Sequence, residues 1–266
     1  MSGARGQWLL LWGVVAFDLV FLALPTLIVL VASFTAGEII SFPPEGLSLR
    51  WYAALLERPA FVDAFWRSLH VAAVCTAISV PAGTLAAVAL VRYRVRLRRT
   101  LQVYFLLPFT VPLIVSGIGM MLVFGEARVL GRLWPVGLAA CVINLPFMIW
   151  AVSASVNALD PDLEDAAANC GAPPLQTFLT VTLPAVMPGV ITGSLIMFIL
   201  ALNEFIVSLL LTDARIVTLP VLIYNSIRGV TTPDLAAVSV VYIAVAVASI
   251  WVLDRLVGLD VFLRSK

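Results

Sequence analysis

Apolar runs about as long as a membrane-spanning helix recur along the whole chain, and they restrict its fold more than any other feature. Hydrophobic residues make up 62% of the 266 residues and charged residues only 12%, whereas about a quarter of a soluble domain is charged. A run of about 20 apolar residues can cross a bilayer as a helix, which satisfies its own backbone hydrogen bonds. The sequence therefore predicts an all-α membrane protein.

We expect six transmembrane helices, forming one domain over residues 1–266 with both termini cytoplasmic. The predicted spans are about 8–34, 65–90, 101–124, 133–156, 185–211 and 235–257. The first run is too long for a signal-peptide core and lacks a small-residue cleavage pattern, so we interpret it as a retained span. Proline and glycine in the third span, with Asn144 and Pro146 in the fourth, are typical of helices that line a translocation path, or of simple packing kinks.

Five arginines within eight residues follow the second span and indicate its cytoplasmic end by the positive-inside rule. They are Arg92, Arg94, Arg96, Arg98 and Arg99. Arg264 and Lys266 place the C-terminal tail on the same side. We interpret the arginines as topological, with contact to anionic lipid headgroups worth about 1 kcal/mol each; a regulatory role is the alternative.

Several functional classes are disfavoured by the composition. The net charge of +1, without basic and aromatic residues interleaved, does not favour a nucleic-acid partner. Cys75, Cys141 and Cys170 lack paired spacing and His70 is the single histidine, so neither a disulfide framework nor a metal site is expected. No Gly-rich phosphate loop or GxSxG motif occurs, so we expect no catalytic residue and no cofactor on this chain.

Residues 160–184 form a polar, helix-forming island between two apolar runs. Asp160 can cap a helix, Pro161 suits its first turn, and the acids that follow stabilise the positive end of the helix dipole. Gly171 offers a left-handed C-cap, and Pro173 and Pro174 force a turn before a second short amphipathic segment. The island therefore predicts a helix, a glycine hinge and another helix on one membrane face.

The spacing within this island resembles the EAA loop of permease subunits of ATP-binding-cassette (ABC) importers. The residues that carry the resemblance are Asp165, Ala166, Ala167, Gly171, Val181, Leu183 and Pro184. Two departures are Asp165, where the family usually has Glu, and Cys170, where a larger aliphatic residue is common. The resemblance implies a MetI-like type I importer fold, in which helix 162–170 is a lever and Glu164 or Asp165 meets basic groups of the ATPase.

The resemblance also implies a set of partners in the bacterial cytoplasmic membrane. These are two ATP-binding subunits that bind ATP and Mg, a second permease subunit expected to be a different chain, an extracytoplasmic solute-binding protein, and membrane lipid. The permease itself would be non-catalytic, and the ATPase a separate chain.

Two acidic residues fall within predicted spans, Asp18 in the first and Glu204 in the fifth. Ionisable groups at membrane depth are costly and commonly functional. Counted as one helix from Ala185, Glu204 lies about 28 Å along the span, near its outer end. Asp18 and Glu204 are therefore candidate pathway residues. The alternatives are an interhelical hydrogen bond for Asp18 and an ion pair of Glu204 with Arg215 or Arg228.

Residues 201–239 resemble the corresponding stretch of spermidine/putrescine permeases. Asn203-Glu204 stand where those permeases have a pair of acids, and Leu219-Pro220, Ile223-Tyr224 and Pro233-Asp234 follow in the same order. The resemblance to the importer family covers nearly all of the chain after residue 60, and the stretch 201–239 implies a small cationic or zwitterionic solute. Asn203 replaces one of the two acids, which weakens a strict polyamine assignment.

Three other functions stay open. Importers of opines, aminoethylphosphonate, iron, thiamine or sulfate share much of this layout. A secondary transporter or channel could use Asp18 and Glu204 for proton coupling, although the chain shows no clear internal repeat. An intramembrane enzyme would need a catalytic set, and no HExxH, GxSxG or paired intramembrane aspartates are present.

Overall fold

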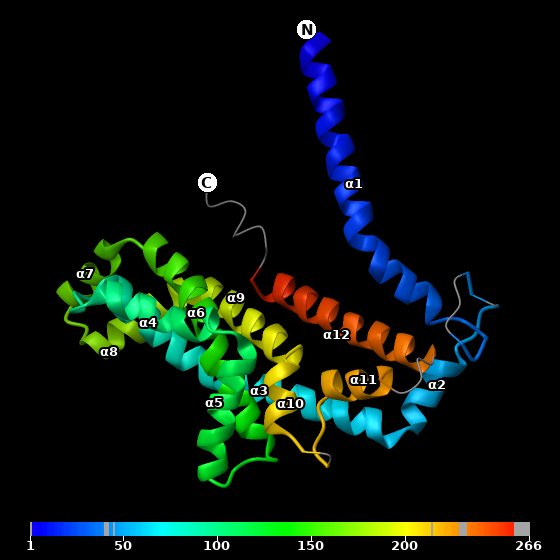
Figure 1. Ribbon diagram of the computed structural model, residues 1–266. Helices are drawn as coiled ribbons and strands as arrows, with labels where there is room; N and C mark the ends of the chain where they lie inside the picture. The colour runs from blue at the N-terminus through cyan, green and yellow to red at the C-terminus, as the bar shows by residue number, and fades with distance from the viewer. Residues whose placement is uncertain (1, 40–42, 45, 214, 229–232, 258–266) are drawn as a thin grey trace. The chain divides into compact units, whose positions relative to one another are not determined.

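Helices account for nearly all regular structure, as the apolar runs predict. The computed structural model describes residues 2–39, 43–44, 46–213, 215–228 and 233–257 (Figure 1). The chain divides into one unit of residues 1–62 and 223–245 and another of residues 63–222 and 246–266. Each unit is described by itself, and the single-domain organisation stays a prediction.

The first unit contains α1 (Ser2–Ala32), α2 (Arg50–Glu57) and the first part of α12 (Pro233–Val257). The most apolar stretch of α1 buries none of its residues, as expected of a surface that lipid or another protein covers. The loop after α1 is held by two hydrogen bonds, Ser33 Oγ with Tyr52 Oη at 2.6 Å and Trp51 Nε1 to Thr35 O at 2.9 Å.

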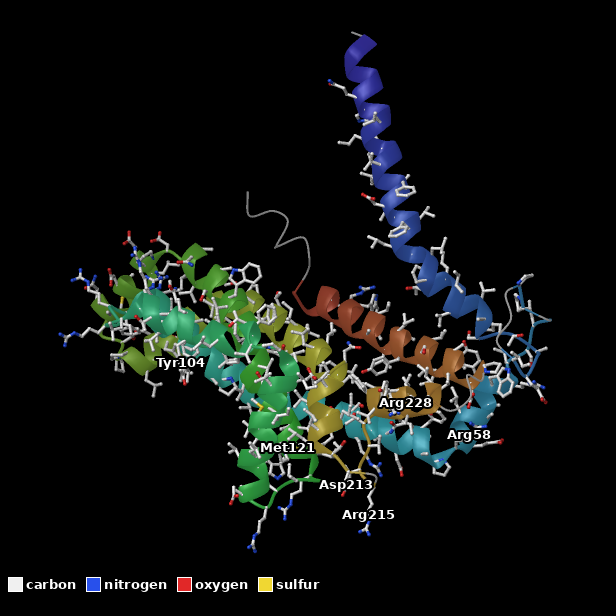
Figure 2. The ribbon with its side chains drawn as sticks, in the orientation of Figure 1. Arg58, Tyr104, Met121, Asp213, Arg215 and Arg228 are labelled. Atoms are coloured by element: carbon white, nitrogen blue, oxygen red, sulfur yellow. The ribbon has the colours of Figure 1, made fainter. Side chains whose placement is uncertain are left out.

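An ion pair joins two helix boundaries in this unit. Arg58, the C-cap of α2, pairs with Asp234 in the first turn of α12. The side chain of Asp234 is 3% exposed, and a carboxylate so buried requires a partner or hydrogen bonds. Figure 2 labels Arg58, and also Arg228, whose guanidinium lies over the Tyr224 ring, 5.8 Å from its centroid.

The second unit is built on α3 (Pro59–Arg92), α6 (Leu133–Ala158) and α9 (Leu183–Leu202). Helices α6 and α9 pack side by side because α9 presents glycines to α6. A Cβ at Gly189 would come within 2.8 Å of the Ala151 carbonyl oxygen, and one at Gly193 would overlap Met148. Small residues at such contacts let membrane helices approach closely.

The third predicted span is broken rather than continuous. Helices α4 (Arg98–Thr110) and α5 (Leu113–Glu126) meet at 96° across Val111 and Pro112. Proline disfavours helical backbone in the residue before it, and Val111 is extended with ψ 138°. Helix α5 then packs against α10 (Ile206–Leu211) around Val71, Ile143 and Val207, with Met121 at its edge (Figures 1 and 2).

Length and composition identify fewer than six candidate spans among the described residues. The described residues hold four helices long and apolar enough to cross a membrane, or five if the bent pair α4–α5 is one span. The last predicted span, 235–257, coincides with α12. Six spans and cytoplasmic termini stay predictions.

Candidate functional site

The polar island folds locally as its sequence predicts. Helix α7 (Pro161–Asn169) begins after Asp160, whose Oδ1 accepts a hydrogen bond of 3.0 Å from the backbone N–H of Asp162. It ends at Gly171, which has the left-handed φ of +87°. The Gly171 and Ala172 amides donate to the carbonyls of Ala168 and Ala167, which is the Schellman arrangement. The predicted cap and left-handed glycine are confirmed.

The second half of the island continues directly into the next span. Helix α8 (Pro174–Thr177), a π-helical turn η1 (Phe178–Thr182) and α9 form one apolar helix from Pro174 to Leu202. The predicted span start at Ala185 falls within this helix, and the span bounds stay a prediction. The π turn explains how the helix accommodates Pro184. In a regular α-helix the proline ring would clash with the preceding turn, and the π turn changes the backbone hydrogen bonding there.

The hairpin of α7 and α8 carries exposed apolar side chains beside exposed acids. Leu163 is 53% exposed, Leu175 70% and Leu179 52%. Asp162 and Asp165 are exposed on the same hairpin. Space around Gly171 is open, since a Cβ there would meet no atom within 4 Å.

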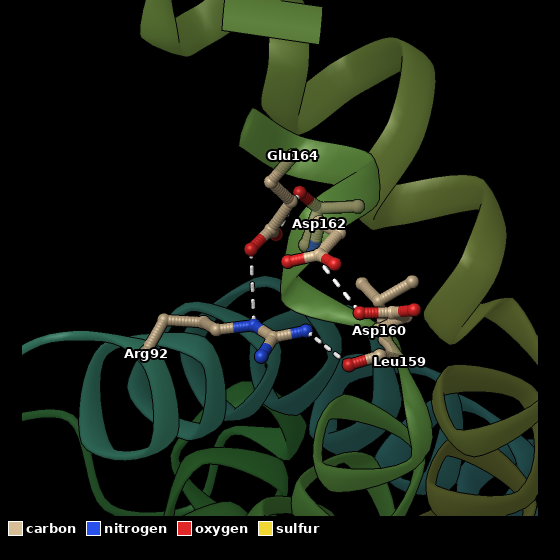
Figure 3. Close-up of polar contacts among 6 residues, drawn as sticks. Arg92, Leu159, Asp160, Asp162 and Glu164 are labelled. Carbon is tan, nitrogen blue, oxygen red and sulfur yellow. Dashed lines mark hydrogen bonds and ion pairs between the residues drawn. The ribbon is translucent and has the colours of Figure 1, made fainter. Parts of the chain in front are cut away.

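Glu164, in contrast, contacts the rest of its own unit (Figure 3). Its Oε2 lies 3.0 Å from Arg92 Nε, and its Oε1 accepts a 2.5 Å hydrogen bond from Thr182 Oγ1. Arg92 also donates from Nη2 to the Leu159 carbonyl oxygen at 2.6 Å. Of the two acids expected to meet the ATPase, Asp165 is exposed and Glu164 is engaged within the chain.

A cavity of about 520 Å³ lies where two broken helices meet α6. It is lined by the α4–α5 break, by α6 and by the end of α9; the lining includes Thr110, Asn144, Asn203 and Glu204. Phe109 and Phe147 also line it and contact each other edge to face, with centroids 5.1 Å apart. Irregular backbone at membrane depth is tolerated where it lines a cavity or is buried in protein.

Glu204 lies in the break between α9 and α10, not within a continuous helix. Helix α9 ends at Leu202, with Asn203 as its C-cap. The Glu204 Oε1 accepts a 3.0 Å hydrogen bond from the Val207 N–H, and this bond caps α10. The count of about 28 Å along one helix is therefore wrong, because the helix stops before the carboxylate.

The ion pair of Glu204 with Arg215 is absent among the described residues. Arg215 lies instead on the loop after α10, where its backbone N–H donates to Asp213 Oδ1 at 2.9 Å (Figure 2). The same oxygen accepts the N–H of Ile216. This Asx-type turn fixes the conformation of the loop. Among the described contacts, the Glu204 side chain bonds to the backbone N–H of Val207.

The candidate residues predicted from the sequence thus lie at separate locations in the structure. The island from Glu164 to Pro184 forms one site, while Asn203 and Glu204 share the cavity. Asp18 is exposed on α1 in the other unit, and its pathway role stays a prediction. Asn144 could be noticed in the sequence because it is a polar residue near Pro146 in an apolar run. The neighbouring sequence did not distinguish Phe109 or Phe147 from other apolar residues, or Arg92 from the other arginines of its group.

Helices broken around a largely apolar cavity that holds one acidic side chain, together with a helical hairpin that exposes acids, are typical of a membrane transport component. Residues 79–259 match the family described as "Binding-protein-dependent transport system inner membrane component". The chain belongs to this family. It is accordingly a multi-pass inner-membrane permease and a non-catalytic part of an ABC transporter whose ATPase is a separate subunit.

Named relatives differ in what their names say they transport. The putrescine transport system permease protein PotI of Escherichia coli K12 is 31% identical over 229 residues, covering 82% of this chain and 80% of the relative. The molybdenum transport system permease protein ModB of Mycobacterium bovis is 33% identical over 233 residues, covering 80% and 87%. The family rules out the enzyme, channel and secondary-transporter alternatives and leaves the solute open.

A solved structure supports the fold. The crystal structure of a bacterial ABC transporter involved in import of the acidic polysaccharide alginate contains a chain that superposes with a TM-score of 0.74 at 17% identity. The match covers 95% of this chain and 96% of the other. The predicted importer-permease fold is confirmed at this level.

Proposed function

We propose that this chain forms half of the pathway of an ATP-driven importer for a small cationic or zwitterionic amine. The observation that carries the proposal is the Glu204 carboxylate at the break between α9 and α10, on the wall of the cavity. Sequence identity cannot choose between the solutes named for PotI and ModB, because the two are about equally similar to the chain. The negative charge in the cavity supports an amine.

The electrostatics of the lining favour a cation. Glu204 is the one formally charged side chain among the residues that line the cavity. Two helix C-termini, those of α4 and α9, and one N-terminus, that of α5, meet there, so their dipoles together add negative potential to the cavity. The faces of Phe109 and Phe147 add the negative potential of aromatic rings, which attracts ammonium groups.

Coupling to ATP hydrolysis would occur through the α7–α8 hairpin. Its exposed leucines and acids have the composition expected for docking on a basic, partly apolar groove. We infer that this surface meets the ATPase on the cytoplasmic side, that both termini lie on that side, and that a second permease, a different chain, completes the pathway. A solute-binding protein would deliver the amine from outside.

Stimulated ATP hydrolysis tests the proposed substrate class. The complex, reconstituted with its binding protein, would be exposed to putrescine, spermidine, 2-aminoethylphosphonate, an opine and sulfate. We expect putrescine or another amine to raise the ATPase rate and sulfate to leave it at its basal value, since a carboxylate-lined path repels an anion. Stimulation by sulfate alone would overturn the amine assignment and leave the importer assignment standing.

A further inference from the structure

We propose that Arg92 is a positioning residue that links the coupling helix α7 to the ends of α3 and α6. The inference rests on the proposed function, because it assumes that α7 receives motion from an ATPase. The same residue was interpreted from the sequence as a topological charge. The structure assigns it a contact that its neighbouring arginines lack.

Arg92 is the last residue of α3 and bridges two further elements. Its Nη2 donates to the carbonyl of Leu159, the C-cap of α6, and its Nε pairs with Glu164 of α7. A cation at a helix C-terminus is favoured by the helix dipole. The guanidinium therefore fixes the ends of α3 and α6 against the first turns of α7 (Figure 3).

Burial separates Arg92 from the other arginines of its loop. The side chain of Arg92 is 16% exposed and that of Glu164 is 21% exposed. Arg94, Arg96, Arg98 and Arg99 are all exposed. A charge pair removed from water to this extent interacts more strongly than a surface pair and is costly to break from one side, because the remaining charge is left without its partner.

A second bond carries the link from α7 into α9. Thr182 is 3% exposed and lies in the π turn that leads into α9, and its hydroxyl donates to Glu164. Helix α9 ends at Leu202, and its C-cap Asn203 precedes Glu204 on the cavity wall. A displacement of Glu164 would thus act on α3 through Arg92 and, through Thr182, on the helix that ends at the cavity.

This arrangement explains why two polar side chains, Arg92 at the end of α3 and Thr182 in the π turn, converge on the Glu164 carboxylate. A hairpin that served only to hold the ATPase would need its outer surface alone. Both carboxylate oxygens of Glu164 instead contact residues of this chain, one Arg92 and the other Thr182. These two contacts of Glu164 would connect the docking helix α7 rigidly to the spans.

The experiment compares Arg92→Gln with Arg94→Gln in the complete reconstituted complex. Both changes remove one positive charge from the same loop, but only the first removes the pair with Glu164. We expect Arg92→Gln to lower putrescine uptake per ATP hydrolysed about tenfold, a loss equivalent to about 1.4 kcal/mol, while its ATPase activity persists. Arg94→Gln should retain the wild-type ratio.

Hydrogen exchange provides a second readout that needs no solute. Upon addition of MgATP, exchange in residues 183–202 should change in wild type and in Arg94→Gln but not in Arg92→Gln. Thr182→Val should resemble Arg92→Gln, and Thr182→Ser, which keeps the hydroxyl, should resemble wild type. In Arg92→Gln combined with Glu164→Gln, coupling should be no worse than in the poorer single variant, because the two residues act as one pair.

The possible failures are distinguishable. If wild type neither imports putrescine nor responds to MgATP, the proposed function fails and the inference with it. If wild type responds and Arg92→Gln responds equally, the function stands and the positioning role of Arg92 is refuted. Arg92→Lys, which retains the charge, should recover part of the coupling; losses that simply sum in the double variant would also refute the pairing.

Discussion

Replacing Glu204 with glutamine is expected to abolish most of the response to a cationic amine while leaving the cavity folded. Glutamine keeps an oxygen that can accept the Val207 N–H, so the cap of α10 is retained. What it removes is the negative charge on the cavity wall. Because a hydrogen bond to a charged group contributes about 1.5–3 kcal/mol, we expect at least a tenfold loss of amine-stimulated ATPase activity.

Two further variants separate charge from structure. Glu204→Ala removes both the charge and the cap, so it should lower thermal stability as well as the response to amine. Asn203→Asp adds a second acid beside Glu204 and should strengthen the preference for a dication over a monocation. A Glu204→Gln complex that responds to putrescine like wild type would return Glu204 to a purely structural role as the cap of α10.

Replacing Gly171 with aspartate is expected to disconnect the ATPase from the spans without unfolding the chain. Aspartate is among the residues that best tolerate the left-handed φ of +87° found there, and no atom of this chain lies within 4 Å of the added Cβ. The added bulk and charge would therefore act on the docked partner. We expect at least a tenfold loss of ATP-driven uptake, comparable to disruption of an interface hot spot.

Cys170 offers a direct readout of that docking. It is exposed next to Gly171, whereas Cys75 and Cys141 are buried, so a water-soluble maleimide reports on Cys170. Bound ATPase should protect Cys170 in wild type and much less in Gly171→Asp. Gly171→Asn, of similar size without the charge, measures the contribution of bulk alone. Equal labelling of Cys170 with and without ATPase would contradict docking at this hairpin.

Features set by neighbouring residues could be predicted from the sequence. The cap at Asp160 and the left-handed Gly171 depend on bonds reaching only a few residues along the chain. Long apolar runs likewise predicted where most helices lie, because hydrocarbon thickness sets their length. The sequence motif at Asp165 to Pro184 also indicated the family, which the comparison over residues 79–259 confirmed.

Helix breaks were harder to place than helices. Pro112 breaks its span, yet Pro184 and Pro188 lie within a helix that continues to Leu202. Proline weakens a helix in each case, and whether the backbone adapts depends on neighbours and on local π adjustments. For the same reason, the end of α9 before Glu204 was missed although the acid itself was singled out.

Contacts between distant segments were beyond the sequence alone. Arg92 and Glu164 are 72 residues apart, and either could have been a solvated charge. Only packing of α3 against the island brings them to 3.0 Å. The aromatic pair of Phe109 and Phe147 likewise gave no signal among the many apolar residues of the chain.

Uptake of labelled putrescine into sealed vesicles most directly tests whether this chain passes an amine under ATP control. The vesicles would contain the chain with its ATPase, second permease and binding protein. We predict accumulation that requires hydrolysable ATP, fails with a non-hydrolysable analogue, and is undiminished by excess molybdate. Accumulation without ATP, or uptake of labelled molybdate together with no uptake of any amine, would contradict the account.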